Sequence, residues 1–272
     1  MRHKPIAFID SGVGGLPYLA YTRGLLPDER YVYVADRANF PYGGKPRARI
    51  IDAVASVVEA LIAREDPQLI VVACNTASVV ALEALRARFP VPFVAVVPAV
   101  KPAAAASGER RFGVLATRRT VEGKYLRDLV RRFAAGCTVV SLPAGGLVEF
   151  VEQDLLGASR AQRLARVAAE VERFRQAGID ILVLGCTHFL HLEEEFRELL
   201  GPEGIRIIDS RDGVARQVAH LLGAPTEGAA KAADAEAAAP TGSFYVTGFL
   251  PIEERYLLFA ERFGLALGGV LE

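Results

Sequence analysis

Short apolar runs alternate along the chain with longer segments in which apolar residues recur every three or four positions. Runs rich in Val, Ile and Leu that end at polar or turn-forming residues are typical of buried strands in a parallel sheet. The expected strands are Ile6–Ile9, Tyr31–Ala35, Leu69–Ala73, Phe93–Val97, Arg111–Ala116, Thr138–Leu142, Ile179–Leu184, Ile205–Ser210 and Ser243–Val246.

The segments between these runs show the period of amphipathic helices. The expected helices are Leu16–Leu25, Arg47–Ala63, Ser78–Phe89, Thr120–Phe133, Ala161–Gln176, Arg211–Leu222 and Pro251–Phe263. Strands that alternate with helices predict an α/β fold with parallel sheets. From Ala224 to Gly242 the sequence is rich in Ala, Pro and Gly, and we expect a mobile linker or loop there.

The order of the elements occurs twice. The first strand of each repeat ends at Asp10 or Thr117, and a later strand of each ends at Cys74 or Cys186. We interpret this as two βαβα units related by duplication. The segment 97–108 is expected to cross from one unit to the other.

Composition narrows the class of protein. The 272 residues carry no net charge, whereas a nucleic-acid-binding protein normally has a basic excess. No apolar segment is long enough to cross a membrane, and the sequence begins without a secretory signal, so we expect a cytoplasmic protein. The three cysteines form neither a disulfide framework nor a zinc-binding spacing, and no metal site is expected. Cys137 is interpreted as a small buried hydrophobic residue.

Cys74 and Cys186 each follow a buried strand directly and precede a residue with an amide or hydroxyl group. Open α/β sheets bind ligands at the carboxyl ends of their strands, so we expect the two thiols to face one site from two sides. Two such groups on opposite faces of one carbon atom would exchange its proton and invert its configuration. Inert buried cysteines, a redox dithiol, and a hydrolase that uses Cys186 with His188 are the alternatives.

Some other residues near these strand ends allow two interpretations each. The turn at Asp10-Ser11-Gly12 could bind a small anion through backbone N–H groups or could simply cap a helix. His188 could tune Cys186 or bind a carboxylate, or it could be a polar residue at a helix start. Glu152, taken alone, is interpreted as an ordinary surface acid of a helix. Hydrogen-bond donors for a substrate carboxylate and ammonium are expected at Tyr42, Gly43, Asn75, Thr76 and Thr187.

Four motifs together resemble the glutamate racemase family of the cofactor-independent aspartate/glutamate racemase superfamily. They are Asp10-Ser11-Gly12-Val13-Gly14-Gly15, Pro41-Tyr42-Gly43, Ala73-Cys74-Asn75-Thr76-Ala77 and Gly185-Cys186-Thr187-His188-Phe189. The likeness extends from about Ile6 to Leu222. The alanine-rich stretch near 229–239 and Pro17 in the first helix depart from the family.

The resemblance implies two pseudosymmetric, flavodoxin-like α/β domains with the active site in the cleft between them. The domains would be 1–98 with 208–272, and 99–207. The implied activity interconverts L- and D-glutamate, without pyridoxal phosphate, metal or other cofactor, and supplies D-glutamate for peptidoglycan. A homodimer is implied, with no nucleic-acid or membrane partner. Aspartate racemase, whose first turn usually resembles Gly-Gly-Met-Gly, is the nearest alternative, and a non-catalytic binding domain of the periplasmic type is a more distant one.

The resemblance also implies a role for each residue. Cys74 and Cys186 would be the two bases, with Asp10 assisting the first and Glu152 and His188 the second; Glu149 lies close enough in sequence to compete with Glu152 for this role. The residues that would bind the substrate are Asp10, Ser11, Tyr42, Gly43, Asn75, Thr76, Thr117, Thr120, Thr187 and His188.

Overall fold

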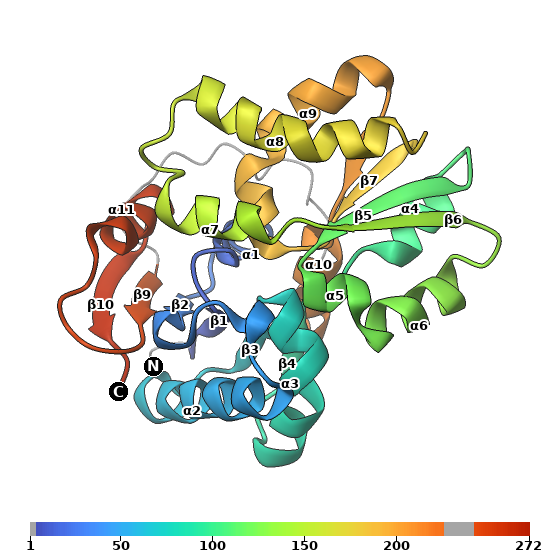
Figure 1. Cartoon of the computed structure of the whole chain (residues 1–272). Helices are drawn as coiled ribbons and strands as arrows, with labels where there is room; N and C mark the ends of the chain where they lie inside the picture. Colours follow the sequence, from blue (N-terminus) through green and yellow to red (C-terminus); the bar gives the residue numbers. More distant parts are fainter. Residues whose placement is uncertain (1–3, 226–241) are drawn as a thin grey trace. The chain divides into compact units, whose positions relative to one another are not determined.

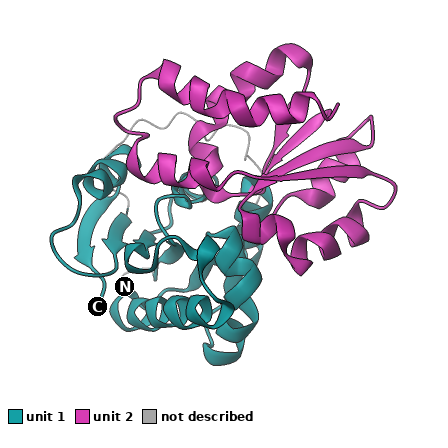
Figure 2. Cartoon of the chain, viewed as in Figure 1, with its two compact units in different colours: residues 1–96, 211–272 teal, residues 97–210 magenta. Residues whose placement is uncertain are grey.

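The computed structural model describes residues 4–225 and 242–272, in two units that each contain one sheet. Unit 1 comprises residues 1–96 and 211–272, and unit 2 comprises residues 97–210 (Figure 2). The predicted linker lies mostly within 226–241, outside the described residues. Every strand pairing in the described part of the chain is parallel, which confirms the predicted α/β class.

The sheet of unit 1 has six strands in the order β10-β9-β2-β1-β3-β4 (Figure 1). Their bounds are β1 Ile6–Asp10, β2 Tyr31–Ala35, β3 Leu69–Val72, β4 Phe93–Ala95, β9 Gly242–Val246 and β10 Ala266–Val270. The strand β1 lies between β2 and β3, and all three are fully buried, which explains why their sequences are continuously apolar. The helices of this unit are α1 Leu16–Leu25, α2 Arg47–Glu65, α3 Asn75–Arg88, α10 Arg211–Leu222 and α11 Glu254–Arg262, with short 3₁₀ turns η1 Arg37–Asn39 and η2 Tyr42–Gly44.

Alternate residues of these strands face opposite sides of the sheet. Ile9 and Val34 pack with Ile50 and Val54 of α2 in one core cluster. Helices α2 and α3 pack against each other, and so do α1 and α10.

The sheet of unit 2 has four strands in the order β6-β5-β7-β8. The elements are α4 Val100–Ala106, β5 Arg111–Ala116, α5 Arg118–Glu122, α6 Lys124–Phe133, β6 Thr138–Pro143, α7 Gly145–Gln153, α8 Arg160–Arg175, β7 Ile181–Leu184, η3 Thr187–Leu192, α9 Glu193–Leu200, η4 Gly201–Glu203 and β8 Arg206–Ile208. The order β6-β5-β7-β8 repeats the order β2-β1-β3-β4 of unit 1, with the cysteine strand beside the first strand in both.

Most predicted elements are present with ends shifted by a few residues, but the structure also departs from the expectations in several places, and the helices α4, α7 and α9 were not predicted. The helix predicted over Thr120–Phe133 is interrupted at Gly123, whose backbone is extended (φ −72°, ψ 147°). The segments after both cysteines are helical, α-helical after Cys74 and 3₁₀ after Cys186. The last helix begins at Glu254 instead of Pro251, because Glu253 before it is extended. The edge strand β10 was missed, since its Ala-Leu-Gly-Gly-Val sequence has no clear apolar pattern.

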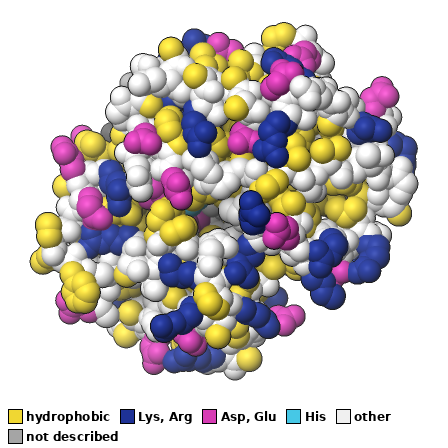
Figure 3. Space-filling view, in the orientation of Figure 1, with side chains coloured by type: hydrophobic (Ala, Val, Ile, Leu, Met, Phe, Trp, Pro, Cys, Tyr) yellow, Lys and Arg dark blue, Asp and Glu magenta, His cyan; other side chains and the backbone are white. Residues whose placement is uncertain are grey.

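The surface carries acidic and basic side chains interspersed over much of the face in Figure 3, with basic side chains gathered over α6. In that helix Lys124 forms an ion pair with Asp128 at 2.7 Å, and Arg131 pairs with the same carboxylate. Within residues 4–225 and 242–272, no helix combines the length and the apolar composition of a membrane span.

Candidate active site

The two cysteines occupy equivalent positions in the two sheets. Each lies two residues beyond the last paired residue of its strand, which is Val72 in β3 and Leu184 in β7. The residue before Cys74 donates its N–H to the carbonyl of Ile9, and the residue before Cys186 donates to Leu115, both at 2.7 Å. The backbone angles agree as well, with φ −136° and ψ 119° at Cys74 and φ −134° and ψ 135° at Cys186. Within the described part of the chain neither cysteine forms a disulfide bond, and both are almost fully buried.

The turn after β1 brings the carboxylate of Asp10 and the hydroxyl of Ser11 to the end of the sheet. Asp10 Oδ1 accepts hydrogen bonds from the N–H of Gly12 at 2.9 Å and from the Ser11 hydroxyl at 3.3 Å. Both side chains are buried. Helix α1 then begins in close contact with the end of β3, the strand that leads to Cys74. A Cβ atom added at Gly15 would lie only 2.7 Å from the Cβ of Ala73. This close approach requires glycine at position 15.

Tyr42 lies at the same end of unit 1, with its hydroxyl donating to Asp36 Oδ2 at 2.5 Å. Its pKa is raised well above the usual value, first by burial, then by the charge of Asp36 and the hydrogen bond to it, and further by Cys74 and Asp10. Tyr42 is therefore a neutral hydrogen-bonding group at neutral pH. Tyr42 and Cys74 also belong to the same cluster of buried residues in unit 1.

Asn75 and Thr76 begin helix α3 immediately after Cys74 and are buried. Neither the oxygen nor the nitrogen of the Asn75 side-chain amide has a hydrogen-bond partner among the described residues. A buried amide without partners is destabilising by about 1–3 kcal/mol, so such groups are uncommon outside functional sites. A bound ligand with a carboxylate or ammonium group would satisfy it. Gly43, in η2, is half-buried.

In unit 2 the structure brings Glu152 and His188 together. Helix α7 presents Glu152, and η3 presents His188 two residues after Cys186. His188 Nε2 donates to Glu152 Oε1 at 2.8 Å, and both side chains are about 2% exposed. Glu149, the competing acid of the same helix, is exposed. The carboxylate orients the imidazole next to the cysteine, an arrangement that suits proton transfer.

Three threonines complete the end of this sheet. Thr117 caps α5 by accepting the N–H of Thr120 at 3.4 Å, and their hydroxyls lie 3.0 Å apart. Thr120 and Thr187 are buried, whereas Thr117 is partly exposed. These hydroxyls follow the carboxyl ends of β5 and β7, where ligands bind in open α/β sheets.

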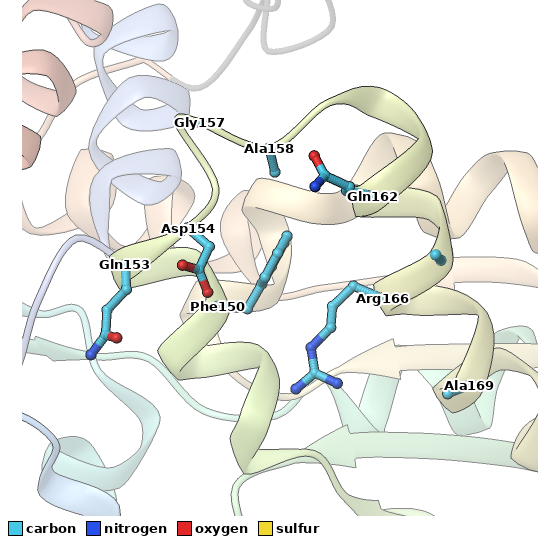
Figure 4. A pocket seen from close by; sticks show the side chains of 9 residues that line it. Phe150, Gln153, Asp154, Gly157, Ala158, Gln162, Arg166 and Ala169 are labelled. Carbon is cyan, nitrogen blue, oxygen red and sulfur yellow. The ribbon is translucent and has the colours of Figure 1, made fainter.

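None of the predicted residues lines the cavity shown in Figure 4. This cavity of about 710 Å³ lies between α7 and α8, with Phe150, Gln153 and Arg166 among its lining residues. Among the described residues there is also no cluster of three or more His, Cys, Asp or Glu side chains able to hold a metal ion.

Two residues of unit 1 that support the site were not predicted. Asp36 is buried and accepts hydrogen bonds from Tyr42, from Asn39 at 3.1 Å and from Thr247 at 2.5 Å. Its position at the end of β2, like that of Asp10 at the end of β1, was a signal that could have identified it. Tyr33 donates to the carbonyl of Gly12 at 2.8 Å and accepts the N–H of Gly15 at 3.0 Å. Tyr33 has no such signal in the sequence, because a tyrosine inside an apolar strand is equally typical of a core residue without a functional role.

Comparison with known proteins identifies the family. Residues 18–250 match the Asp/Glu/Hydantoin racemase family. The chain is 39% identical over 268 residues to glutamate racemase of Treponema pallidum (strain Nichols), covering 98% of this chain and 96% of that protein. It is 42% identical over 262 residues to glutamate racemase of Escherichia coli O157:H7, covering 95% and 88%. The structure of Escherichia coli glutamate racemase in complex with L-glutamate and the activator UDP-MurNAc-Ala superimposes with a TM-score of 0.86, at 39% identity and 98% coverage of both chains. The chain therefore belongs to the glutamate racemases of the Asp/Glu/Hydantoin racemase family, which are isomerases.

Proposed function

We propose that the protein interconverts L- and D-glutamate by a two-base mechanism in which Cys74 and Cys186 act on opposite faces of Cα. The observation that carries this proposal is the equivalent presentation of the two thiols, in hydrogen-bond register, backbone conformation and burial. Duplicated structural cysteines would have no reason to stay at the carboxyl end of the strand, where ligands bind in this class of sheet.

In one direction, the thiolate of one cysteine removes the Cα proton of the substrate and becomes a thiol. The opposing thiol then gives its proton to the other face of the carbanion and becomes a thiolate. The reverse reaction exchanges the two roles, so protons and charge balance in both directions. Each base contributes roughly 10²–10⁴-fold, and stabilisation of the carbanion by fixed hydrogen-bond donors must supply the rest.

The surrounding groups divide this work. Asp10 assists Cys74, and the Glu152–His188 pair assists Cys186. The amide of Asn75 and the groups of Ser11, Tyr42, Gly43, Thr76, Thr117, Thr120 and Thr187 bind the substrate, as do Asp10 and His188. The unsatisfied amide of Asn75 supports this assignment most directly.

The named relatives point to glutamate as the substrate. D-Glutamate would then be supplied for peptidoglycan, in the cytoplasm, by a protein that we expect to be a homodimer without a cofactor. Aspartate racemisation and cysteine-dependent hydrolysis are the competing outcomes of the test.

The test incubates the purified protein in heavy water with each enantiomer of glutamate and, in parallel, with each enantiomer of aspartate. We expect loss of optical activity and deuterium at Cα for glutamate only, with no added cofactor. Exchange of aspartate alone would replace glutamate by aspartate as substrate. Absence of exchange with both amino acids would overturn the proposed reaction.

A further inference from the structure

Tyr33 links the strand β2 to the turn that follows β1. Its hydroxyl donates to the carbonyl of Gly12 at 2.8 Å and accepts the N–H of Gly15 at 3.0 Å, so a single oxygen joins both ends of this turn. The side chain has no solvent exposure, and its ring stacks on Phe244 with centroids 5.4 Å apart and planes 18° apart. The ring is therefore fixed from β9, and the hydroxyl has little freedom to move.

The turn held by this hydroxyl contacts the surroundings of both Asp10 and Cys74, which together we call the half-site of Cys74. Gly12, whose carbonyl binds Tyr33, also donates its N–H to Asp10 Oδ1 at 2.9 Å. Gly15, whose N–H binds Tyr33, lies against Ala73, the residue before Cys74. Movement of the turn would thus displace the carboxylate of Asp10 and remove the packing that supports the cysteine strand end.

A second tyrosine on the same strand provides a contrast. Tyr31 is equally buried, and its hydroxyl donates to the carbonyl of Leu26 at 2.7 Å, just beyond the C-terminal end of α1. Tyr31 and Tyr33 thus bind the two ends of the same helix, but only Tyr33 contacts the turn at the site. In unit 2 the strand position equivalent to Tyr33 is Ser141, paired with Val114 as Tyr33 is paired with Phe8, and its side chain is far shorter.

We propose that Tyr33 is a positioning residue of this enzyme, whose hydroxyl holds the Asp10–Gly15 turn in the conformation required by Asp10 and Cys74. This inference rests on the proposed function, because it assigns the turn to the half-site of Cys74. Tyr33 itself does not touch the reacting atoms. Its role is specific to unit 1.

The test compares Tyr33→Phe with Tyr31→Phe, since each removes one buried hydroxyl from the same strand and keeps the ring. We measure kcat and KM for both enantiomers of glutamate, the melting temperature, and hydrogen exchange of the amides in the turn. Tyr33→Phe should lower kcat/KM by about tenfold to a hundredfold, since small displacements of catalytic groups have effects of this size. The kcat/KM of Tyr31→Phe should stay within about twofold of the wild-type value, even if its melting temperature falls by as much as that of Tyr33→Phe.

The primary deuterium isotope effect separates positioning from general loss of stability. Tyr33→Phe should change this effect mainly for the enantiomer whose proton Cys74 removes. Equal loss of activity in the two variants, or activity of Tyr33→Phe within about twofold of the wild type, would overturn the inference. If the wild type does not racemise glutamate, the proposed function fails. Hydrogen exchange then tests the inference separately. Faster exchange of the Gly15 amide in Tyr33→Phe, but not in Tyr31→Phe, would support the inference, and unchanged exchange in Tyr33→Phe would overturn it.

If Tyr33→Phe does not fold, Phe244→Leu tests the same arrangement through the ring of Tyr33. This substitution removes the aromatic ring of β9 that stacks on Tyr33 and should loosen the position of its hydroxyl. The inference predicts the same unequal isotope effect with a smaller loss in kcat/KM. Wild-type kinetics in Phe244→Leu would contradict it.

Discussion

Cys74 in unit 1 and Cys186 in unit 2 leave their strands with the same backbone conformation, yet different groups surround them. Near Cys74 the acid is Asp10, which comes from the end of the neighbouring strand β1. The equivalent strand position in unit 2 is Ala116, as the backbone bonds Asp36 N–H to Asp10 and Ala144 N–H to Ala116 indicate. In unit 2 the buried acid near the cysteine motif lies on helix α7 instead, where Glu152 binds His188.

The two units also differ in the residue two positions after each cysteine. It is Thr76 in unit 1 and His188 in unit 2. The backbone that places the thiols was thus retained in both units, while each unit acquired its acid from a different element. Under the proposed mechanism the two thiols would meet mirror-image substrates, and such a difference would suit them because the rest of a glutamate molecule is not symmetric about its Cα.

The largest expected effect comes from removing either thiol. Cys74→Ala and Cys186→Ala should each lower racemisation by about 10²–10⁴-fold or more, because each removes one of the two bases of the proposed mechanism. Cys137→Ala is the control, since Cys137 is half-buried just before β6 and far in sequence from both motifs. Activity is followed by polarimetry. If Cys74→Ala kept wild-type activity while Cys186→Ala lost it, the two units would not be equivalent and a single-cysteine mechanism would replace the proposal.

Much of the fold could be predicted because parallel strands are buried on both faces and are therefore apolar throughout. The strand ends at Ala35 and Leu184 were predicted correctly, and so were both ends of α1 and α10. The break at Gly123 could not be predicted, because the apolar period continues through it. The order of strands in the sheets was also beyond the sequence pattern, since order depends on long-range packing.

The candidate site was predictable where chemistry-bearing residues follow strand ends directly, as Cys74, Cys186 and Asp10 do. The sequence alone could not decide whether Glu149 or Glu152 is the acid near Cys186, since the two residues lie three positions apart on one helix. The structure separates them by burial and by the hydrogen bond to His188. Tyr33 was not predicted because its role depends on a contact with a residue distant in sequence, whereas Asp36 follows a strand end and could have been identified as Asp10 was.

A smaller effect should distinguish the acids of the two units. Asp10→Asn and Glu152→Gln should each lower kcat/KM by about tenfold or more, since each weakens the support of one base. The primary isotope effect should rise for opposite enantiomers in the two variants, because each slows proton removal by its own cysteine. Glu149→Gln is the matched control on α7 and should behave as the wild type. Equal changes for both enantiomers in both variants would show that the acids do not divide between the thiols.

The two units should contribute differently to the loss of stability at alkaline pH, because their buried tyrosines have different surroundings. Burial and the charge of Asp36 raise the pKa of Tyr42 well above 10, whereas in unit 2 burial alone raises the pKa of Tyr125. A raised pKa in the folded state stabilises the protein fully below the unfolded pKa, and this contribution is lost as pH rises towards the folded pKa. Above pH 10 each such phenol therefore lowers the free energy of unfolding by up to about 1.4 kcal/mol per pH unit.

Tyr42→Phe should make this alkaline loss shallower, because the substituted side chain has no proton to release on unfolding. Tyr125→Phe should have the smaller effect, since burial raises the pKa of Tyr125 and no carboxylate among the described residues adds to this rise. The measurement is urea unfolding between pH 9 and 11 for the wild type and both variants. Identical pH slopes in the wild type and Tyr42→Phe would contradict the buried, neutral phenol assigned to the half-site of Cys74.

The smallest expected effect concerns the residue that precedes each cysteine strand. In unit 1 this is Gln68, whose neutral amide donates to Lys4 and Glu29. In unit 2 it is Asp180, whose carboxylate accepts the Ser107 hydroxyl at 2.7 Å and the Glu109 N–H at 3.0 Å. Burial works to raise the pKa of Asp180, but these hydrogen bonds outweigh it and the pKa lies below its usual value.

A lowered pKa stabilises the folded protein above the unfolded pKa, near 4, and this contribution is lost as pH falls through the folded pKa. Asp180→Asn should therefore lower the free energy of unfolding at pH 7 by about 1 kcal/mol, with the difference from the wild type shrinking below pH 4. Asp154→Asn, which alters an exposed carboxylate of the same unit, serves as the control in urea unfolding at pH 3 and pH 7. A deficit of Asp180→Asn that persisted unchanged at pH 3 would mean that the charge of Asp180 does not hold the segment before β5. Unit 2 would then lack the acid sensitivity that distinguishes it from unit 1, where the neutral Gln68 occupies the equivalent position.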